Sequence, residues 1–188
     1  TAASCRAAGL AQVRTARMNA ERLDVADGAF DLAVCALGLM YVPDPVAALA
    51  EMRRAVRAGG RVVATVWGER RHCGWADIFP IVDARVSSEV CPLFFGLGAP
   101  DALLRAFADA GMPAGEERRE RRELHFADAA ALLTAVLLGG PVAMAVKRFT
   151  PAEMDAVRSE FLASVAAYRR QDGSYAVPGE FVTVAAEA

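Results

Sequence analysis

Residues 30–67 read FDLAVCALGLMYVPDPVAALAEMRRAVRAGGRVVATVW, and this stretch decides the fold class. Its two ends, 30–37 and 61–67, are nearly continuous apolar runs, as expected of strands buried on both faces of a parallel sheet. Between them, an Asp-Pro pair predicts the start of a helix over 46–57, and a Gly-Gly pair predicts its end. A right-handed crossover makes the two strands parallel, so the chain is predicted to be α/β.

Ligands of such sheets bind beyond the carboxyl ends of the strands. In this chain those ends are residues 35–39 and 66–68. The sequence therefore predicts a binding site formed by two segments about thirty residues apart in the chain, on the scale of one strand–helix unit.

The rest of the chain is mostly helical with a few further strands. A Glu/Arg-rich segment at 116–126, which contains ERRERRE, is interpreted as a solvated edge strand because its charges nearly cancel. Gly139, Gly140 and Pro141 are interpreted as a turn between two helices. The other expected elements are helices at 2–9, 74–86, 100–110, 128–138 and 151–169, strands at 11–18 and 181–185, and a loop at 171–179.

Composition excludes several functional classes. The chain has 188 residues with 21 basic and 23 acidic side chains, a balance that gives no electrostatic footprint for nucleic acid. No apolar run reaches the roughly 18 residues of a membrane span. The four cysteines form no CxxC pair, so neither a zinc site nor a disulfide framework is predicted, and a cytoplasmic location with reduced thiols is expected.

Residues 19–67 resemble the part of class I S-adenosylmethionine (SAM)-dependent methyltransferases that follows their glycine-rich turn. Four features occur in the same order: Asn19 followed by Ala-Glu, the Asp-Gly-Ala-Phe-Asp motif at 27–31, the Pro-Asp helix start at 43–44, and the Arg-Ala-Gly-Gly-Arg exit at 57–61. The ordered set is more specific than any one of its parts. Among the branches of this family, the chain is most similar to the ubiquinone/menaquinone biosynthesis methyltransferases.

The resemblance implies a Rossmann-like sheet with a helical cap, SAM as cofactor and a small-molecule methyl acceptor. Residues 1–70 would form the C-terminal part of the SAM-binding core, 71–170 the cap and substrate region with one core strand near 116–126, and 171–188 a closing loop and the last strand. No GxGxG precedes Asn19. The chain is therefore expected to be N-terminally truncated and to lack the first two strands of the family's sheet, with 11–18 as the third strand.

The resemblance also assigns residues to the cofactor. The Asn19 side chain would accept a hydrogen bond from the adenine amino group, although the family usually has Asp there. The backbone N–H of the next residue would bind a ring nitrogen, and the end of the first core strand would line the cleft. The residues expected to contact SAM are Asn19, Ala20, Glu21, Cys35, Ala36, Leu37 and Tyr41.

Acceptor residues are expected after the second core strand. Trp67 and Trp75, with Tyr41, would form an aromatic wall for an apolar acceptor or for the sulfonium cation. His72 is the candidate general base for an O-methylation. The alternative interpretation of His72 is an exposed loop residue beside two arginines. No metal ligands are predicted.

Two other functions compete with methyl transfer. The chain could be a non-catalytic methyltransferase-like remnant that acts as a binding or assembly protein, which the missing glycine-rich turn suggests. A nucleotide-dependent oxidoreductase ranks lower, because it too needs a glycine-rich turn. The acceptor, the acceptor atom and the oligomeric state remain open at the level of sequence.

Overall fold

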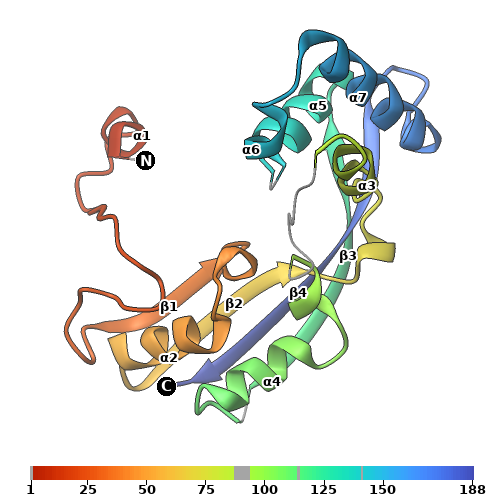
Figure 1. The fold of residues 1–188 in the computed structure, drawn as a ribbon. Helices are drawn as coiled ribbons and strands as arrows, with labels where there is room; N and C mark the ends of the chain where they lie inside the picture. The colour runs from red at the N-terminus through yellow and green to blue at the C-terminus, as the bar shows by residue number, and fades with distance from the viewer. Residues whose placement is uncertain (1, 87–93, 114, 141) are drawn as a thin grey trace.

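Four strands form one mixed sheet in the order β1-β2-β4-β3 (Figure 1). The computed structural model describes residues 2–86, 94–113, 115–140 and 142–188, so Cys91 and Pro141 lie outside the described residues. β1 (Phe30–Ala36) is parallel to β2 (Val56–Trp67), and β4 (Tyr175–Glu187) is antiparallel to both β2 and β3 (Glu116–Phe126). The predictions of an α/β fold and of two parallel strands at 30–67 are confirmed.

The helix between β1 and β2 begins as predicted but ends earlier. The Asp44 side chain accepts a hydrogen bond of 2.9 Å from the backbone N–H of Ala47 and caps α2 (Pro45–Ala55). The glycine pair does not end this helix, because Val56 already pairs with Phe30 of β1 and starts the next strand. Both glycines lie inside β2, and Gly59 has a φ of 72°, which favours glycine.

One face of the sheet is covered by α2 and α4 (Ala102–Asp109), and we call it the covered face (Figure 1). Side chains alternate between the faces of a strand, so every second residue of β2 and β4 points toward these helices. Those residues are buried and form the core with Leu49, Leu103 and Phe107 of the helices: Val62, Ala64, Val66, Val182, Val184 and Ala186.

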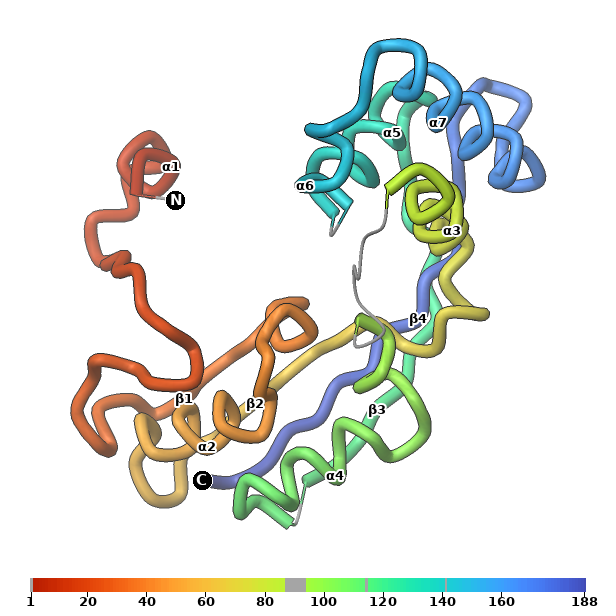
Figure 2. Tube along the Cα trace, in the orientation of Figure 1, coloured from red at the N-terminus to blue at the C-terminus, as the bar shows by residue number. Residues whose placement is uncertain are grey.

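β3 and β4 run past the end of β2 and carry a second group of helices (Figures 1 and 2). This group consists of α3 (Ile78–Asp83), α5 (Ala129–Leu138), α6 (Ala143–Val146) and α7 (Pro151–Ser164). α7 begins with a capping box, since Thr150 and Glu153 each accept a hydrogen bond from the other's backbone N–H. The assignment of residues 71–170 to a cap and substrate region stays a prediction.

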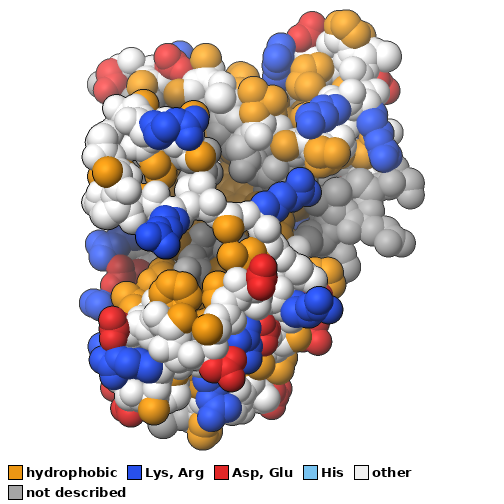
Figure 3. All heavy atoms as spheres, turned by 90° about the vertical axis from the view of Figure 1, so that its left-hand side faces the viewer, with side chains coloured by type: hydrophobic (Ala, Val, Ile, Leu, Met, Phe, Trp, Pro, Cys, Tyr) orange, Lys and Arg blue, Asp and Glu red, His pale blue; other side chains and the backbone are white. Residues whose placement is uncertain are grey.

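β1 is exposed, although its sequence predicted burial on both faces. The exposed fractions of Leu32 and Val34 are 52% and 60%. Two facts explain the difference: β1 pairs with a neighbour along one edge only, and no described helix covers its outward-facing side chains. Seen from the left-hand side of Figure 1, the surface of the molecule shows apolar side chains mixed with basic and acidic ones (Figure 3).

The N-terminal arm contains one short helix, α1 (Ala2–Ala7), and Gly9 follows it with a φ of 68°. The strand predicted at 11–18 is wrong: these residues have no strand partner and are exposed. A strand needs a neighbour for its backbone hydrogen bonds, and the arm leads away from the sheet (Figure 2).

Other expected boundaries also shift. The loop predicted at 171–179 is wrong in its second half, because β4 begins at Tyr175. The helix expected at 74–86 is confined to α3, and that expected at 151–169 ends at Ser164 before a 3-10 turn at Ala166–Tyr168. The edge strand at 116–126 has the predicted bounds.

Candidate active site

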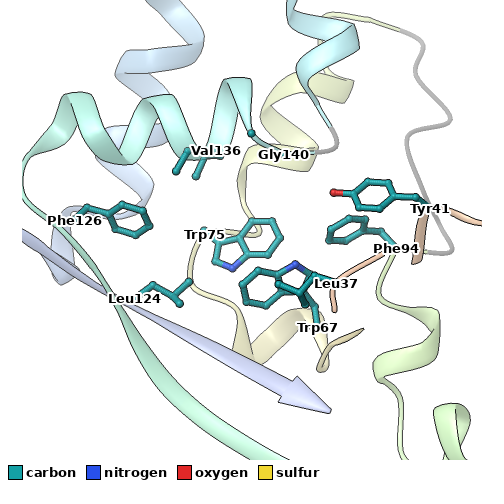
Figure 4. Close-up of a pocket in the computed structure, with 11 residues that line it drawn as sticks. Leu37, Tyr41, Trp67, Trp75, Phe94, Leu124, Phe126, Val136 and Gly140 are labelled. Carbon is teal, nitrogen blue, oxygen red and sulfur yellow. The ribbon is translucent and has the colours of Figure 1, made fainter. Parts of the chain in front are cut away.

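A pocket of about 370 Å³ opens between the carboxyl ends of β1 and β2 and the helix α5 (Figure 4). Leu37 and Tyr41 follow β1, and Trp67 ends β2. The other walls come from β3, through Leu124 and Phe126, and from the carboxyl half of α5. The pocket therefore lies where the sheet topology predicts a ligand site.

Aromatic rings make up much of the pocket wall. The rings of Trp67 and Trp75 meet edge to face with centroids 4.9 Å apart, and Trp75 contacts Phe94 at 6.0 Å in the same manner. Tyr41 stands edge to face with Phe94 at 5.5 Å. Such pairs hold one another in fixed orientations, and the wall that they form favours flat apolar ligands beside them.

Leu37 turns the chain off the sheet at the edge of this pocket. Its φ of 53° lies in the left-handed region, which is strained for a branched side chain. The backbone N–H of Leu37 donates to the carbonyl oxygen of Thr65 at 2.8 Å, which ties this turn to β2. Backbone strain of this kind is concentrated at binding sites.

The structure brings together four residues expected from the sequence. Leu37, Tyr41, Trp67 and Trp75 line the same pocket. Cys35 and Ala36 do not line it, and the Cys35 thiol is half-buried, which raises its pKa. For both sets of residues, the assignment to the cofactor or to the acceptor stays a prediction.

Asn19 and Ala20, expected at adenine, and Glu21, expected at the cofactor, do not line this pocket. The Asn19 side-chain oxygen accepts the backbone N–H of Glu21 at 3.0 Å, and the Glu21 carboxylate accepts the N–H of Asp44 at 2.8 Å. Asn19 borders a separate open hollow of about 620 Å³ with Arg17 and Arg22. Adenine binding by these residues stays a prediction.

His72 is engaged in a polar cluster outside the pocket. Its Nδ1 lies 3.0 Å from a carboxylate oxygen of Glu180, and its Nε2 lies 2.9 Å from Nη2 of Arg121. Arginine only donates hydrogen bonds, so Nε2 is the acceptor and Nδ1 carries the proton. The side chain is 20% exposed, which differs from the exposed loop residue considered above. Both nitrogens face groups of this cluster rather than the pocket, so the ring is poorly placed to act as a base there.

Glu69, His72 and Glu180 each offer one metal-ligand atom, and these atoms lie within 4.8 Å of one another. However, Arg121 Nε is 3.2 Å and Arg119 Nη1 is 3.7 Å from the Glu180 carboxylate. Two guanidinium groups already neutralise this carboxylate and would repel a cation. The geometry is that of an ion-pair cluster.

Sequence reasoning missed several residues of the site. Phe94, Leu124 and Phe126 line the pocket, as does the carboxyl half of α5. Leu124 and Phe126 could have been found, because they alternate with polar residues in β3 and so point to one face. Glu180 also carried a signal, since it is a single acid inside the apolar segment at 175–186.

The comparisons with known proteins agree with this architecture. Residues 1–64 match the family described as a methyltransferase domain. The chain has a Rossmann-like α/β fold similar to that of a solved structure described as a methyltransferase. A segment of 55 residues is 44% identical to the demethylmenaquinone methyltransferase of Bacillus velezensis, and it covers 29% of this chain and 24% of that relative. The matched segment thus spans about a quarter of the curated relative's length.

Solved structures resemble this fold over most of the chain. The YcgJ protein of Bacillus subtilis aligns with a TM-score of 0.58 at 14% identity, covering 100% of this chain and 76% of that one. The BH2331 protein of Bacillus halodurans, described as a methyltransferase, gives 0.53 at 15% identity, covering 94% and 78%. Within the described ranges, no helix is both long and apolar enough to cross a membrane.

Proposed function

We propose that this chain forms the acceptor side of a SAM-dependent methyltransferase that modifies a small apolar molecule. The observation that carries the proposal is the position of the aromatic pocket, which lies at the carboxyl ends of β1 and β2 in a methyltransferase-like sheet. The match to a methyltransferase domain supports the reaction, and the composition of the pocket wall supports the kind of acceptor.

The pocket wall selects against polar molecules. Six of its contributors are large apolar or aromatic side chains: Leu37, Trp67, Trp75, Phe94, Leu124 and Phe126. Burial of apolar surface stabilises a complex by about 25 cal/mol per Å². A polar acceptor would lose its hydration without regaining hydrogen bonds. A flat aromatic acceptor fits both the rings and a volume of about 370 Å³.

The same residues fit the cofactor. SAM supplies a methyl group carried on a sulfonium cation, and aromatic faces attract cations. Trp67 ends β2 and Tyr41 follows β1, so both lie near the strand ends where a class I fold holds its cofactor. Their role would be to orient the acceptor and exclude water, because alignment supplies much of the catalysis in such a displacement.

Calorimetric titration tests the proposal. SAM and S-adenosylhomocysteine would be titrated into the 188-residue chain and into the product of the complete gene. Each would then be assayed for transfer of radiolabelled methyl to 2-naphthol, 2-naphthalenethiol, 1-naphthylamine and the polar control sarcosine. We expect the complete product to bind SAM and to methylate at least one naphthyl compound in preference to sarcosine. A folded complete product that binds neither SAM nor S-adenosylhomocysteine would contradict the proposal and favour the non-catalytic remnant.

A further inference from the structure

One loop connects the two tryptophans of the pocket. Trp67 is the last residue of β2, and Trp75 follows after the 3-10 helix Arg70–His72. We call this segment the Trp67–Trp75 loop. The rings of Trp67 and Trp75 pack against each other, so the shape of the pocket depends on the conformation of the loop that connects them.

The loop is attached to β4 at both ends. The backbone N–H of Gly68 donates to the carbonyl oxygen of Glu180 at 2.7 Å, and that of Gly74 donates to Pro178 at 2.9 Å. A side chain at Gly68 would collide with Glu180, and one at Gly74 would come within 2.7 Å of Tyr168. The two glycines therefore allow the loop to lie directly on its support.

The Glu180 side chain holds the middle of the loop. One carboxylate oxygen accepts the backbone N–H of Glu69 at 3.0 Å, and the other lies 3.0 Å from His72 Nδ1. From the opposite side, Arg121 Nε donates to the carboxylate at 3.2 Å. Glu180 thus joins the loop to β3 as well as to β4.

Glu180 is the only charged residue that is buried in the described part of the chain, with 4% of its surface exposed. Burial alone would raise the pKa of its carboxyl group, but the contacts from His72, the Glu69 N–H and Arg121 outweigh it and lower the pKa. The carboxylate is therefore ionised at neutral pH. A buried charge is costly unless all its partners are in place, which makes the arrangement sensitive to a single substitution.

The cluster and the pocket lie on opposite sides of β4. Glu180 and Phe181 are neighbours in the strand, so their side chains point to opposite faces. The Phe181 ring contacts Trp67 at 4.7 Å on the pocket side. The geometry points to Glu180, acting through His72 and the Glu69 backbone, as the positioning residue that sets the Trp67–Trp75 loop and with it the shape of the acceptor pocket. This inference concerns the shape of the pocket, and it holds whether or not the ligand is methylated.

A second Glu–Arg–His cluster provides a matched control. Glu123 lies 3.0 Å from Arg170 and 3.9 Å from His125, so it has the same kinds of partner as Glu180. It is 60% exposed, and these two partners lie outside the Trp67–Trp75 loop. Glu123→Gln therefore removes a similar charge without touching the loop.

Tryptophan fluorescence gives a direct readout, because the chain contains two tryptophans and both line the pocket. Glu180→Gln and Glu123→Gln would be compared with the unaltered chain for 2-naphthol affinity, acrylamide quenching and thermal midpoint. We expect Glu180→Gln to raise the Kd of 2-naphthol about tenfold, equivalent to about 1.4 kcal/mol, and to increase acrylamide quenching. Glu123→Gln should change neither the Kd of 2-naphthol nor acrylamide quenching by more than about twofold. For the Kd, this limit corresponds to about 0.4 kcal/mol.

Two readouts need no ligand, so they decide the matter even if 2-naphthol does not bind. One is acrylamide quenching, and the other is alkylation of Cys73, which lies in the loop and whose burial raises its pKa to about 11. Glu180→Gln should make Cys73 react faster with iodoacetamide at pH 8, measured on the Cys73 peptide by mass spectrometry. A lower thermal midpoint with unchanged quenching and unchanged Cys73 labelling would overturn the inference and leave Glu180 a purely stabilising residue.

His72→Gln covers the case in which Glu180→Gln does not fold. It removes a contact between Glu180 and the loop while the carboxylate keeps both arginines. We expect it to increase quenching and Cys73 labelling in the same direction as Glu180→Gln, and adding Glu123→Gln should change neither further. A folded His72→Gln chain with unchanged quenching and labelling would equally overturn the inference.

Discussion

The two edge strands of the sheet, β1 and β3, have opposite compositions. β3 is a series of glutamates and arginines that pair with one another, for example Arg122 with Glu120 at 2.6 Å. β1 is apolar, and Leu32 and Val34 are more than half exposed. Charged side chains are a common protection of exposed edges against further pairing, whereas apolar runs are typical of interior strands. β3 is thus suited to be an edge, and β1 has an interior strand's sequence at an edge position.

The largest expected effect tests whether side chains of β1 contribute less to stability than side chains of a buried strand. Val34 of β1 is 60% exposed, whereas Val182 of β4 is 0% exposed. Val182→Ala should lower the free energy of unfolding by about 2 kcal/mol, because it removes buried methyl groups and leaves a cavity. The same change at Val34 should cost less than about 0.5 kcal/mol, as for most exposed positions. Urea denaturation measures both, and equal losses would contradict the comparison.

A second experiment adds a charge to the apolar edge strand β1 and removes charges from the edge strand β3. We expect the 188-residue chain to self-associate through β1, since an exposed apolar edge strand pairs readily. Val34→Lys should weaken this association about tenfold, equivalent to about 1.4 kcal/mol, in sedimentation velocity runs.

The matched change on the other edge is Arg118→Thr with Arg122→Thr, at two exposed positions of β3. It should strengthen association, because it removes the charges that keep that edge unpaired. If association responds to the β3 variant but not to Val34→Lys, the contact is formed by β3 and not by β1, which would contradict the comparison.

The smallest effect concerns the segment that leads into β1. Arg54 of α2 binds the carbonyl oxygens of Leu23 and Val25 and pairs with Glu51, and this pairing holds the pKa of Glu51 at about 2. Because the folded pKa is depressed, the contribution is complete above the ordinary value of 4.5 and is lost as pH falls toward about 2. Glu51→Gln should therefore be less stable than the unaltered chain at pH 6, and the gap should close below pH 4 in thermal melts. A gap that widens toward acid pH would contradict this assignment.

The fold was predictable where local signals and pairing agree. The Asp44 cap, the Thr150 capping box and the parallel pairing of the two strands all depend on neighbours that the sequence places nearby. The strand at 11–18 and the burial of β1 could not be predicted reliably, because both depend on what lies beside them in space. The early end of α2 belongs to the same class, since pairing of Val56 with Phe30 overrides the glycine signal.

The candidate site shows the same division. Leu37 and Trp67 follow from the rule that ligands bind beyond strand ends, and both line the pocket. Phe94 precedes the 3-10 helix Gly96–Gly98, and the carboxyl half of α5 belongs to the second group of helices. The resemblance implied a cap over 71–170, but no motif in the sequence singled out these residues as part of the pocket wall. His72 was identified by its residue type, but its partners Glu180 and Arg121 come from distant strands, so its environment could not be inferred.

The central claim is that the aromatic pocket holds the methyl acceptor, and Trp75→Leu in the product of the complete gene tests it most directly. Transfer of radiolabelled methyl from SAM to the preferred naphthyl acceptor would be measured beside calorimetric binding of SAM. We predict that kcat/KM for the acceptor falls at least about tenfold, which corresponds to about 1.4 kcal/mol of lost transition-state stabilisation, while the Kd of SAM changes less than about threefold. An unchanged kcat/KM in the folded variant would contradict the account and place the acceptor elsewhere.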